Sequence, residues 1–486
     1  MSEERLTYRF GPLERRGLLG PVRVGQAAVI VGSLALAVIL LDRMPSATGA
    51  FIGLLLVAAA VALTTVPLAG HTADQWAPVA TSYLLRAGSG RRRFRSTLPM
   101  LGQRDAAAQL PAALSGVRIE SLGVEGSGIG VLSERGGRRL TAVLACRAVS
   151  FALLDPESQE RRLAGWGLVL ATAAQAPIRR LQWIERTAPA QGDELARWLH
   201  DARDPALPLR GEPIVESYLE LIGSSARVTQ DHEVLLAVQV DASRIRARGE
   251  QRAEEVLVEQ AQRIARGLEA AEVKVLGALS AGQLARALRT AFDPYARGEL
   301  TALETVDRRR DGLPPHAAGP LGAREAWDHY RCDGACHATY WIGGWPRVEV
   351  SPMFMNALLS SSDTVRTVAV TFEPVSPERS TREVEAAITR DRADSELRRR
   401  FGQSETARQR QAHEAAIRRE AELASGHGEV RLAGFVTVSG RDEQELAHAC
   451  AEIHQHAARA RLELHRMYGQ QADAFSFTLP LARGLR

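Results

Sequence analysis

Lysine is almost absent from this chain of 486 residues: Lys274 is the only one, so arginine carries nearly all of the positive charge. The 61 basic and 57 acidic residues almost cancel and leave a formal net charge of +4. This balance excludes the pervasive basic field that drives nucleic-acid binding, although a local contact with nucleic acid stays open. Aromatic residues make up only 5% of the chain, which argues against a platform for stacking bases.

The motifs of several enzyme classes are also missing. No G-x-x-x-x-G-K-S/T sequence occurs, so the phosphate loop of one large class of nucleotide hydrolases is absent. Neither G-x-S-x-G nor H-E-x-x-H occurs. The glycine-rich stretch Gly123–Gly130 lies in a predicted β-meander with no helix behind it, and therefore predicts turns. We predict that the chain is not an enzyme and holds no cofactor.

What the chain does contain is two charge-free apolar runs near its N-terminus, Val24–Leu41 and Gly49–Ala69. At roughly 1.5 Å per residue they reach about 27 and 32 Å as helices, close to the hydrocarbon thickness of a bilayer. The short turn between them begins at Asp42. The pattern predicts two transmembrane helices in a hairpin; the alternative is a buried helical hairpin in a soluble core.

Arginines flank both runs and predict the orientation. Arg5, Arg9, Arg15, Arg16 and Arg23 precede the first run, and Arg86, Arg91, Arg92, Arg93 and Arg95 follow the second. By the positive-inside rule, both termini face the cytoplasm. The chain is thus predicted to be a cell-membrane protein with two spans. We predict that Arg15, Arg16, Arg23, Arg91, Arg92 and Arg93 anchor the chain at lipid headgroups. Contact of the 91–93 cluster with nucleic acid is the alternative.

The densest group of potential metal ligands is His329–His337, which holds His329, Cys332, Cys336 and His337. Its spacing is uncommon for zinc, and Cys336 and His337 would point to opposite faces of a strand. We therefore predict packing rather than a metal site. The four cysteines of a body that faces the cytoplasm predict free thiols instead of disulfides.

The rest of the chain predicts an α+β protein, in which the membrane hairpin precedes a cytoplasmic α/β body with ferredoxin-like halves. A β-meander at Gly116–Leu154 with a Gly136-Gly137 turn precedes a helix capped by Asp155. Ala338–Val350 predicts a strand pair around Gly343-Gly344, and Thr301–Arg324 predicts a loop. The predicted organisation is a cytoplasmic N-terminus (1–23), a transmembrane hairpin (24–70), a juxtamembrane connector (71–110), a β-rich domain (111–230) and an α/β domain (231–486) with a projecting charged helical arm at 380–425.

Four stretches carry a resemblance to a known family: Ser150–Asp155 with Trp166 in the helix behind it, His337–Pro346, Leu432–Leu462 and Tyr468–Leu481. They resemble the non-catalytic N-terminal domain of the VirB-type transfer ATPase of type IV secretion, fused to a small two-span inner-membrane subunit. The resemblance implies a membrane-anchored scaffold for conjugation or protein secretion that works with a transfer ATPase on a separate chain and with other inner-membrane subunits, and that forms a homo-oligomer. The arginine and alanine bias fits an actinobacterial host.

Other functions stay open beside this one. The E component of type VII secretion is similar in placing two N-terminal spans before a cytoplasmic α/β domain. A membrane-bound enzyme with an unrecognised site and a DNA-binding adaptor are further hypotheses.

Overall fold

The computed structural model describes residues 24–65, 72–97, 108–123, 128–147, 151–189, 213–214, 216–217, 220, 230–246, 252–306, 312–346, 348–359, 364–376, 378–383, 385–386, 389 and 429–485. The chain divides into two compact units. The smaller unit is Gly11–Arg92 with Tyr468–Gln470. The larger unit, called the body below, includes Arg93–Met467 and Gln471–Arg486.

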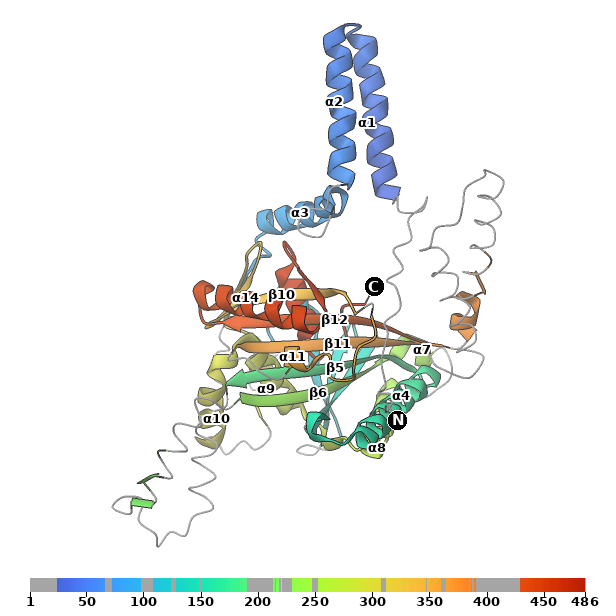
Figure 1. The fold of residues 1–486 in the computed structure, drawn as a ribbon. Helices are drawn as coiled ribbons and strands as arrows, with labels where there is room; N and C mark the ends of the chain where they lie inside the picture. The colour runs from blue at the N-terminus through green and yellow to red at the C-terminus, as the bar shows by residue number, and fades with distance from the viewer. Residues whose placement is uncertain are drawn as a thin grey trace. The chain divides into compact units, whose positions relative to one another are not determined.

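Three helices form the described part of the smaller unit: α1 (Val24–Arg43), α2 (Ala47–Thr65) and α3 (Ala73–Gly88). α1 and α2 lie side by side as a hairpin (Figure 1). The Ser46 hydroxyl accepts a hydrogen bond from the Gly49 N–H at 3.2 Å, which satisfies one free donor at the start of α2. α3 lies within the stretch predicted as a connector.

The described strands of the body form one 13-stranded sheet in which every pairing is antiparallel. The strands are β1 (Arg93–Arg95), β2 (Arg118–Leu122), β3 (Ile129–Glu134), β4 (Arg139–Arg147), β5 (Ile178–Pro189), β6 (Gln230–Asp241), β7 (Lys274–Ala278), β8 (Gly322–Glu325), β9 (Tyr330–Cys332), β10 (Ala335–Gly344), β11 (Val365–Val375), β12 (Glu429–Gly440) and β13 (Glu463–Arg466). The order along the sheet is β1-β8-β9-β10-β12-β11-β5-β6-β4-β3-β2, with β13 beside β10 and β7 beside β4.

This sheet contains two halves with the same element order, β-α-β-β-α-β. The first half is β4, α4 (Pro156–Gln175), β5, β6, α8 (Ala253–Ala270) and β7, and its strand order is β7-β4-β6-β5. The second is β10, α11 (Asn356–Leu359), β11, β12, α14 (Glu443–Arg459) and β13, in the matching order β13-β10-β12-β11. Each half therefore has the element order of a ferredoxin-like unit, and the first half includes β4, α4 and β5, which the sequence analysis assigned to the β-rich domain.

The halves are joined where β5 pairs with β11, with Ile184 opposite Ala369. In each half a long connection follows this joining strand: residues 190–229 after β5, and residues 376–428 after β11. Most of both connections, including most of the predicted arm at 380–425, falls outside the described residues. The predicted domain boundary after residue 230 falls at the start of β6, which is a direct neighbour of β5 in the sheet.

Local sequence signals explain where the principal helices begin. Asp155 accepts a hydrogen bond from the Ser158 N–H, and Pro156 occupies the first turn of α4. Ser280 and Gln283 form a capping box at the start of α9 (Ala281–Phe292). Asp442 caps α14 in the same way as Asp155 caps α4. The shorter elements are α7 (Ala242–Arg246), α10 (Arg297–Val306), α15 (Gln471–Phe475) and the 3₁₀ turns η1 (Ala112–Leu114), η2 (Phe151–Leu153), η3 (Pro294–Ala296), η4 (Pro315–Ala317) and η5 (Ser476–Thr478).

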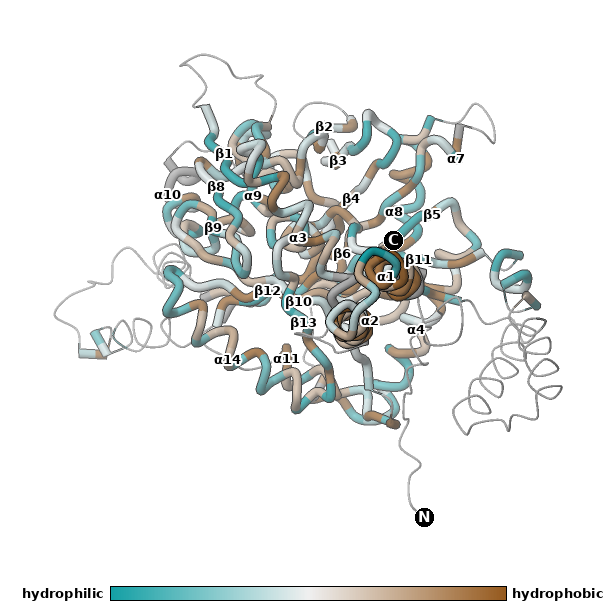
Figure 2. Tube along the Cα trace, turned by 90° about the horizontal axis from the view of Figure 1, so that it is seen from above, coloured by the Kyte–Doolittle hydropathy of each residue, from teal (hydrophilic) through white to brown (hydrophobic). Residues whose placement is uncertain are grey.

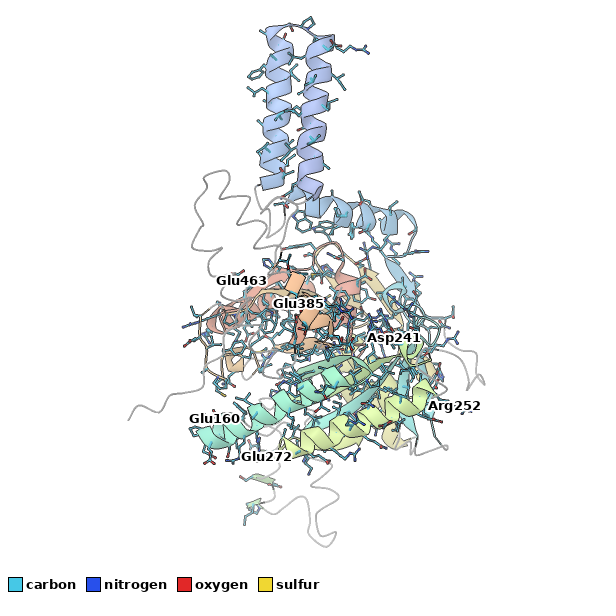
Figure 3. All side chains as sticks on the ribbon, turned by 90° about the vertical axis from the view of Figure 1, so that its right-hand side faces the viewer. Glu160, Asp241, Arg252, Glu272, Glu385 and Glu463 are labelled. Carbon is cyan, nitrogen blue, oxygen red and sulfur yellow. The ribbon has the colours of Figure 1, made fainter. Side chains whose placement is uncertain are left out.

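One face of the sheet is covered by helices. α4 and α8 lie side by side over the first half, and their ends near Glu160 and Glu272 are at the same side of Figure 3. The two helices approach closely because Gly165 has no side chain: a Cβ there would lie 2.6 Å from the Cβ of Ala271. Trp183 on β5 packs against this core and against the core under α11 and α14, so both halves share one helical face.

The opposite face is covered by α9 and by residues 471–485, called the C-terminal segment below. Leu284 and Leu288 of α9 and Leu479 of the segment are fully buried against the strands of the first half. The chain thus has an antiparallel sheet enclosed on both faces, with apolar layers on each.

Two sequence predictions fail within the body. The predicted strand pair around Gly343-Gly344 is wrong, because both glycines end β10, where a Cβ on Gly343 would lie 2.0 Å from the ring of His465. The turn that leads into β10 lies instead between β9 and β10. The predicted loop at Thr301–Arg324 is wrong at both ends, since it begins inside α10 and ends inside β8.

Candidate functional site

The inner side of the α1–α2 hairpin is lined by small and weakly polar residues. Ser33, Ala37, Ala60 and Thr64 are buried between the helices. The hydroxyls of Ser33 and Thr64 donate to carbonyls of their own helices, at 2.8 Å in each case. Small residues let helix backbones approach closely, and internal bonding leaves these hydroxyls without a need for water.

The outer side of the hairpin is apolar almost throughout. The large exposed apolar residues of the two helices are Val29, Val31, Leu34, Leu36, Val38, Ile39, Leu41, Phe51, Ile52, Leu54, Leu55, Val61 and Leu63. Figure 2 looks down on the hairpin and shows both helices in brown. This distribution is the reverse of a water-soluble helical hairpin, in which the large apolar residues face inward.

Among the described residues, one helical segment, Ala47–Thr64 of α2, is long and apolar enough to cross a bilayer. It coincides with most of the second predicted span. The first predicted span coincides with α1, but the two-span topology stays a prediction.

The flanking arginines are only partly within the described chain. The Arg92 guanidinium lies 4.5 Å from the centroid of the Tyr83 ring, a cation–π contact that holds it beside α3. Arg91 and Arg93 are exposed. The predicted anchors Arg15, Arg16 and Arg23 lie outside the described residues.

The cluster at His329–His337 is divided between two environments. The His337 imidazole contacts the Phe292 carbonyl and the Ser439 hydroxyl at 2.9 and 2.8 Å, and burial lowers its pKa to about 4. Cys332 belongs to the core under α9, whereas Cys336 belongs to the core under α14, on the other face of the sheet. Burial raises the pKa of both thiols.

His329, the fourth member, is held by carboxylates near the surface. Its Nδ1 lies 2.9 Å from Asp328, and its Nε2 lies 3.7 Å from Glu443. The structure therefore does not bring the four side chains to one point. Within the described residues, no group of three or more His, Cys, Asp and Glu side chains has a geometry suited to a metal ion.

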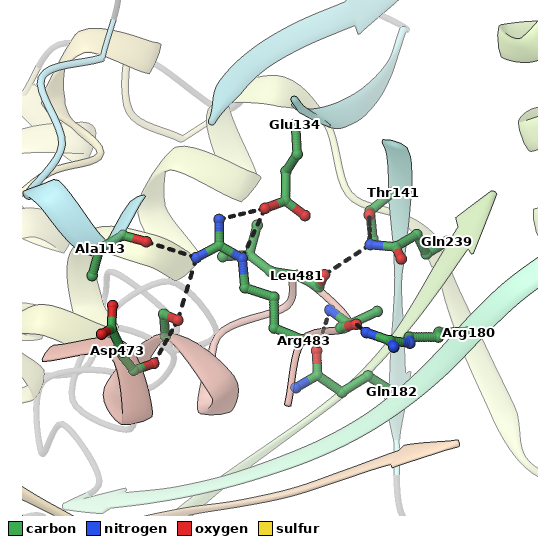
Figure 4. A network of polar contacts seen from close by, with 11 residues as sticks. Ala113, Glu134, Thr141, Arg180, Gln182, Gln239, Asp473, Leu481 and Arg483 are labelled. Atoms are coloured by element: carbon green, nitrogen blue, oxygen red, sulfur yellow. Dashed lines mark hydrogen bonds and ion pairs between the residues drawn. The ribbon is translucent and has the colours of Figure 1, made fainter. Parts of the chain in front are cut away.

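Sequence reasoning missed a polar network of the body that binds the C-terminal segment (Figure 4). The Gln182 side chain donates to the Phe477 carbonyl at 2.7 Å and accepts from the Ala482 N–H at 2.7 Å. Gln239 donates to the Leu481 carbonyl at 2.9 Å. These two glutamines are fully buried, so their amides replace the partners that the segment's main chain would otherwise find in water.

Charged side chains complete this network. Arg180 donates to the Leu485 carbonyl at 2.7 Å and pairs with Glu373 at 2.7 Å. Burial lowers the pKa of the Arg180 guanidinium, and the carboxylate beside it acts in the opposite direction. Thr371 of β11 donates to the Arg483 carbonyl at 2.9 Å. The partners of the segment come from both halves of the sheet. The segment therefore holds β5 and β11 together at the seam, the pair of strands where the two halves meet. The signal in the sequence was the alternation of polar residues at 180 and 182 in a central strand.

A family described as "Putative type VII ESX secretion system translocon, EccE" matches residues 228–342. The matched range includes all of β6 and ends within β10, and so crosses from the first half into the second. No curated protein matches the chain significantly.

This match corrects the type IV resemblance. The stretches that resembled the N-terminal domain of a VirB-type ATPase include His337–Pro346, and the matched type VII family overlaps that stretch. A VirB-type ATPase partner and a role in conjugation are therefore not supported. The match points to a membrane-associated secretion component.

Proposed function

We propose that this chain is a membrane subunit of a type VII secretion translocon, anchored by its N-terminal hairpin. The family match over residues 228–342 carries the proposal. The apolar outer surface of α1 and α2 supports it, because exposing that surface to water is costly and a bilayer removes the cost.

In the proposed topology both α1 and α2 cross the membrane, and the turn at Asp42–Thr48 reaches the outside. The body and both termini then lie in the cytoplasm, with Arg91, Arg92 and Arg93 on the cytoplasmic flank. Arg15, Arg16 and Arg23 would flank the first span in the same way.

The proposed role is structural and not enzymatic. The side chains that could suggest chemistry, Cys332, Cys336 and His337, are buried in packing positions on two faces of the sheet. The working partners would be the other membrane subunits of the translocon, together with further copies of this chain.

Loss of the chain tests the proposed function. Deletion from the native host should abolish secretion of the type VII substrates and break up the large membrane complex that native gels show in the wild type. Complementation with the full chain should restore both. Normal secretion and an intact complex after deletion would exclude the role.

Cysteine labelling tests the topology separately. The four native cysteines are buried, so an engineered surface thiol gives a specific signal. A membrane-impermeant maleimide added to intact cells should label Ser46→Cys in the turn. It should label Ser89→Cys only after the cells are permeabilised. Equal labelling of both sites in intact cells would contradict the two-span topology.

A further inference from the structure

The helix that follows the hairpin, α3, has two faces of different character. One face is engaged within the smaller unit: the Trp76 ring lies 5.9 Å from that of Tyr468, and Arg86 donates to the Gly469 carbonyl at 2.6 Å. Among the described side chains from residue 77 to residue 85, the other face is exposed and uncharged. It consists of Ala77, Pro78, Thr81, Ser82, Leu84 and Leu85.

The exposed face can leave water at little cost although it includes two hydroxyl side chains. Leu84 and Leu85 are 66% and 74% exposed. The Thr81 hydroxyl donates to the Ala77 carbonyl at 2.9 Å, and the Ser82 hydroxyl donates to the Val79 carbonyl at 2.8 Å. Both hydroxyls therefore satisfy their donors inside the helix and can leave water at little cost.

Basic residues follow this face immediately. After a turn at Gly90, whose φ is +70°, come Arg91, Arg92 and Arg93. No acidic residue occurs between Asp74 and Asp105, so this positive charge is not neutralised locally in the sequence.

The chain length confines α3 to the neighbourhood of the membrane that α2 enters. α2 ends at Thr65 and α3 begins at Ala73. At roughly 3.5 Å per residue, the stretch between them reaches at most about 28 Å. An apolar helix face beside a span, followed by arginines, has the composition of a helix that lies in the membrane interface.

We propose that α3 is an interfacial helix that inserts Leu84 and Leu85 among the lipids, while Arg91, Arg92 and Arg93 bind anionic headgroups. Because the arginines need negative charge, α3 and the residues after it bind membranes that contain acidic lipids more strongly than membranes of neutral lipids. The inference rests on the proposed membrane anchoring, and extends it from the hairpin to a second, lipid-selective contact.

Depth-dependent quenching in the full chain tests the proposal. Single bimane labels are placed at Leu34→Cys in the hairpin, at Leu84→Cys or Leu85→Cys in α3, and at Glu157→Cys, whose parent side chain is 83% exposed on the body. The protein is reconstituted in vesicles of phosphatidylcholine with an equal part of phosphatidylglycerol. These vesicles carry a nitroxide either near the headgroup or deep in the acyl chain.

We expect the labels at 84 and 85 to be quenched several-fold more by the shallow nitroxide than by the deep one. The label at 34 should show the reverse order, and the label at 157 should not respond. Replacing Arg91, Arg92 and Arg93 by serine should weaken the association of α3 about fivefold for each arginine. Quenching at 85 in the acidic vesicles should then fall to its level in pure phosphatidylcholine.

The outcomes separate this inference from the proposed function. Quenching at 34 without quenching at 84 and 85 would leave the hairpin anchored and overturn the interfacial helix. Protection of the label at 85 from aqueous iodide without lipid quenching would show that protein covers the face, and would also overturn it. Absence of quenching at 34 would refute membrane anchoring itself.

Discussion

Arg483 and Glu134 form an ion pair that joins the C-terminal segment to β3, with 2.7 Å between Arg483 Nε and Glu134 Oε1. The same guanidinium donates to the Ala113 carbonyl at 2.7 Å. The Glu134 side chain is only 4% exposed, so this carboxylate depends on Arg483 for the charge that compensates its burial.

Removing Arg483 should therefore destabilise the body strongly. We expect Arg483→Ala to lower the free energy of unfolding by about 3–5 kcal/mol, because it leaves the Glu134 carboxylate buried without its cation. Chemical denaturation of the purified full chain in detergent measures the effect. Arg161→Ala is the control, because Arg161 and Glu157 are exposed and their pair should contribute at most about 1 kcal/mol. A loss for Arg483→Ala no larger than the control's would contradict this account.

The spacing between α4 and α8 can be tested by the same substitution at two glycines. Gly165→Ala should destabilise the body by about 1–3 kcal/mol, because its Cβ would lie 2.6 Å from the Cβ of Ala271. Gly167→Ala should be neutral or stabilise by up to about 1 kcal/mol, since no atom lies within 4 Å and alanine favours the helix. Thermal unfolding of both variants measures the difference. Equal effects at the two sites would show that the helices do not pack as described.

His337 should make the stability of the body depend on pH. Its pKa is about 4 in the folded chain, because burial disfavours the imidazolium, whereas an unfolded histidine has an ordinary pKa of 6.5. Between these two pH values the imidazole is protonated in the unfolded state but not in the folded state. The contribution of His337 to the free energy of unfolding is therefore complete above pH 6.5 and decreases as the pH falls toward 4. The total loss is about 3 kcal/mol.

Urea unfolding of the wild type and of His337→Gln from about pH 7.5 to about pH 4.5 isolates this contribution. The variant is expected to be less stable at neutral pH, since the imidazole contacts Phe292 and Ser439, but its stability should fall less steeply with acid. Parallel pH profiles for the two proteins would rule out His337 as the titrating group.

The four cysteines should be unreactive while the chain is folded. All four are buried free thiols, and burial raises the pKa of Cys146 to about 11. Because the thiolate is the reactive form, an aromatic disulfide reagent at neutral pH should react with them only after denaturant is added. Ser89→Cys, at an exposed position, should react at once and serves as the control. Rapid reaction of the native cysteines would contradict their burial.

Local signals allowed much of the fold to be predicted. The cap at Asp155, the alternation that indicates β6 and the helical period of α8 each act over a few residues, so the sequence displays them directly. Gly343 and Gly344 misled the prediction because a glycine pair also occurs where a neighbouring side chain needs space. Here that side chain is His465.

Long-range relations could not be predicted in the same way. Nothing near Ile184 indicates that it faces Ala369 across the seam. Gln182 and Gln239 look like ordinary polar strand positions until the C-terminal segment is placed over them. The resemblance to the type IV family was wrong for a different reason: a shared order of α and β elements does not specify a function.

The C-terminal segment has a consequence for the time course of biogenesis. Glu134 precedes its partner Arg483 by 349 residues, and at roughly 5–20 residues per second a ribosome needs about 20–70 s to make that stretch. Within this interval, once β6 has been made, β5 and β6 can pair, but Gln182 and Gln239 do not yet have their partners in the C-terminal segment. The nascent body therefore lacks the cover of its C-terminal segment for tens of seconds.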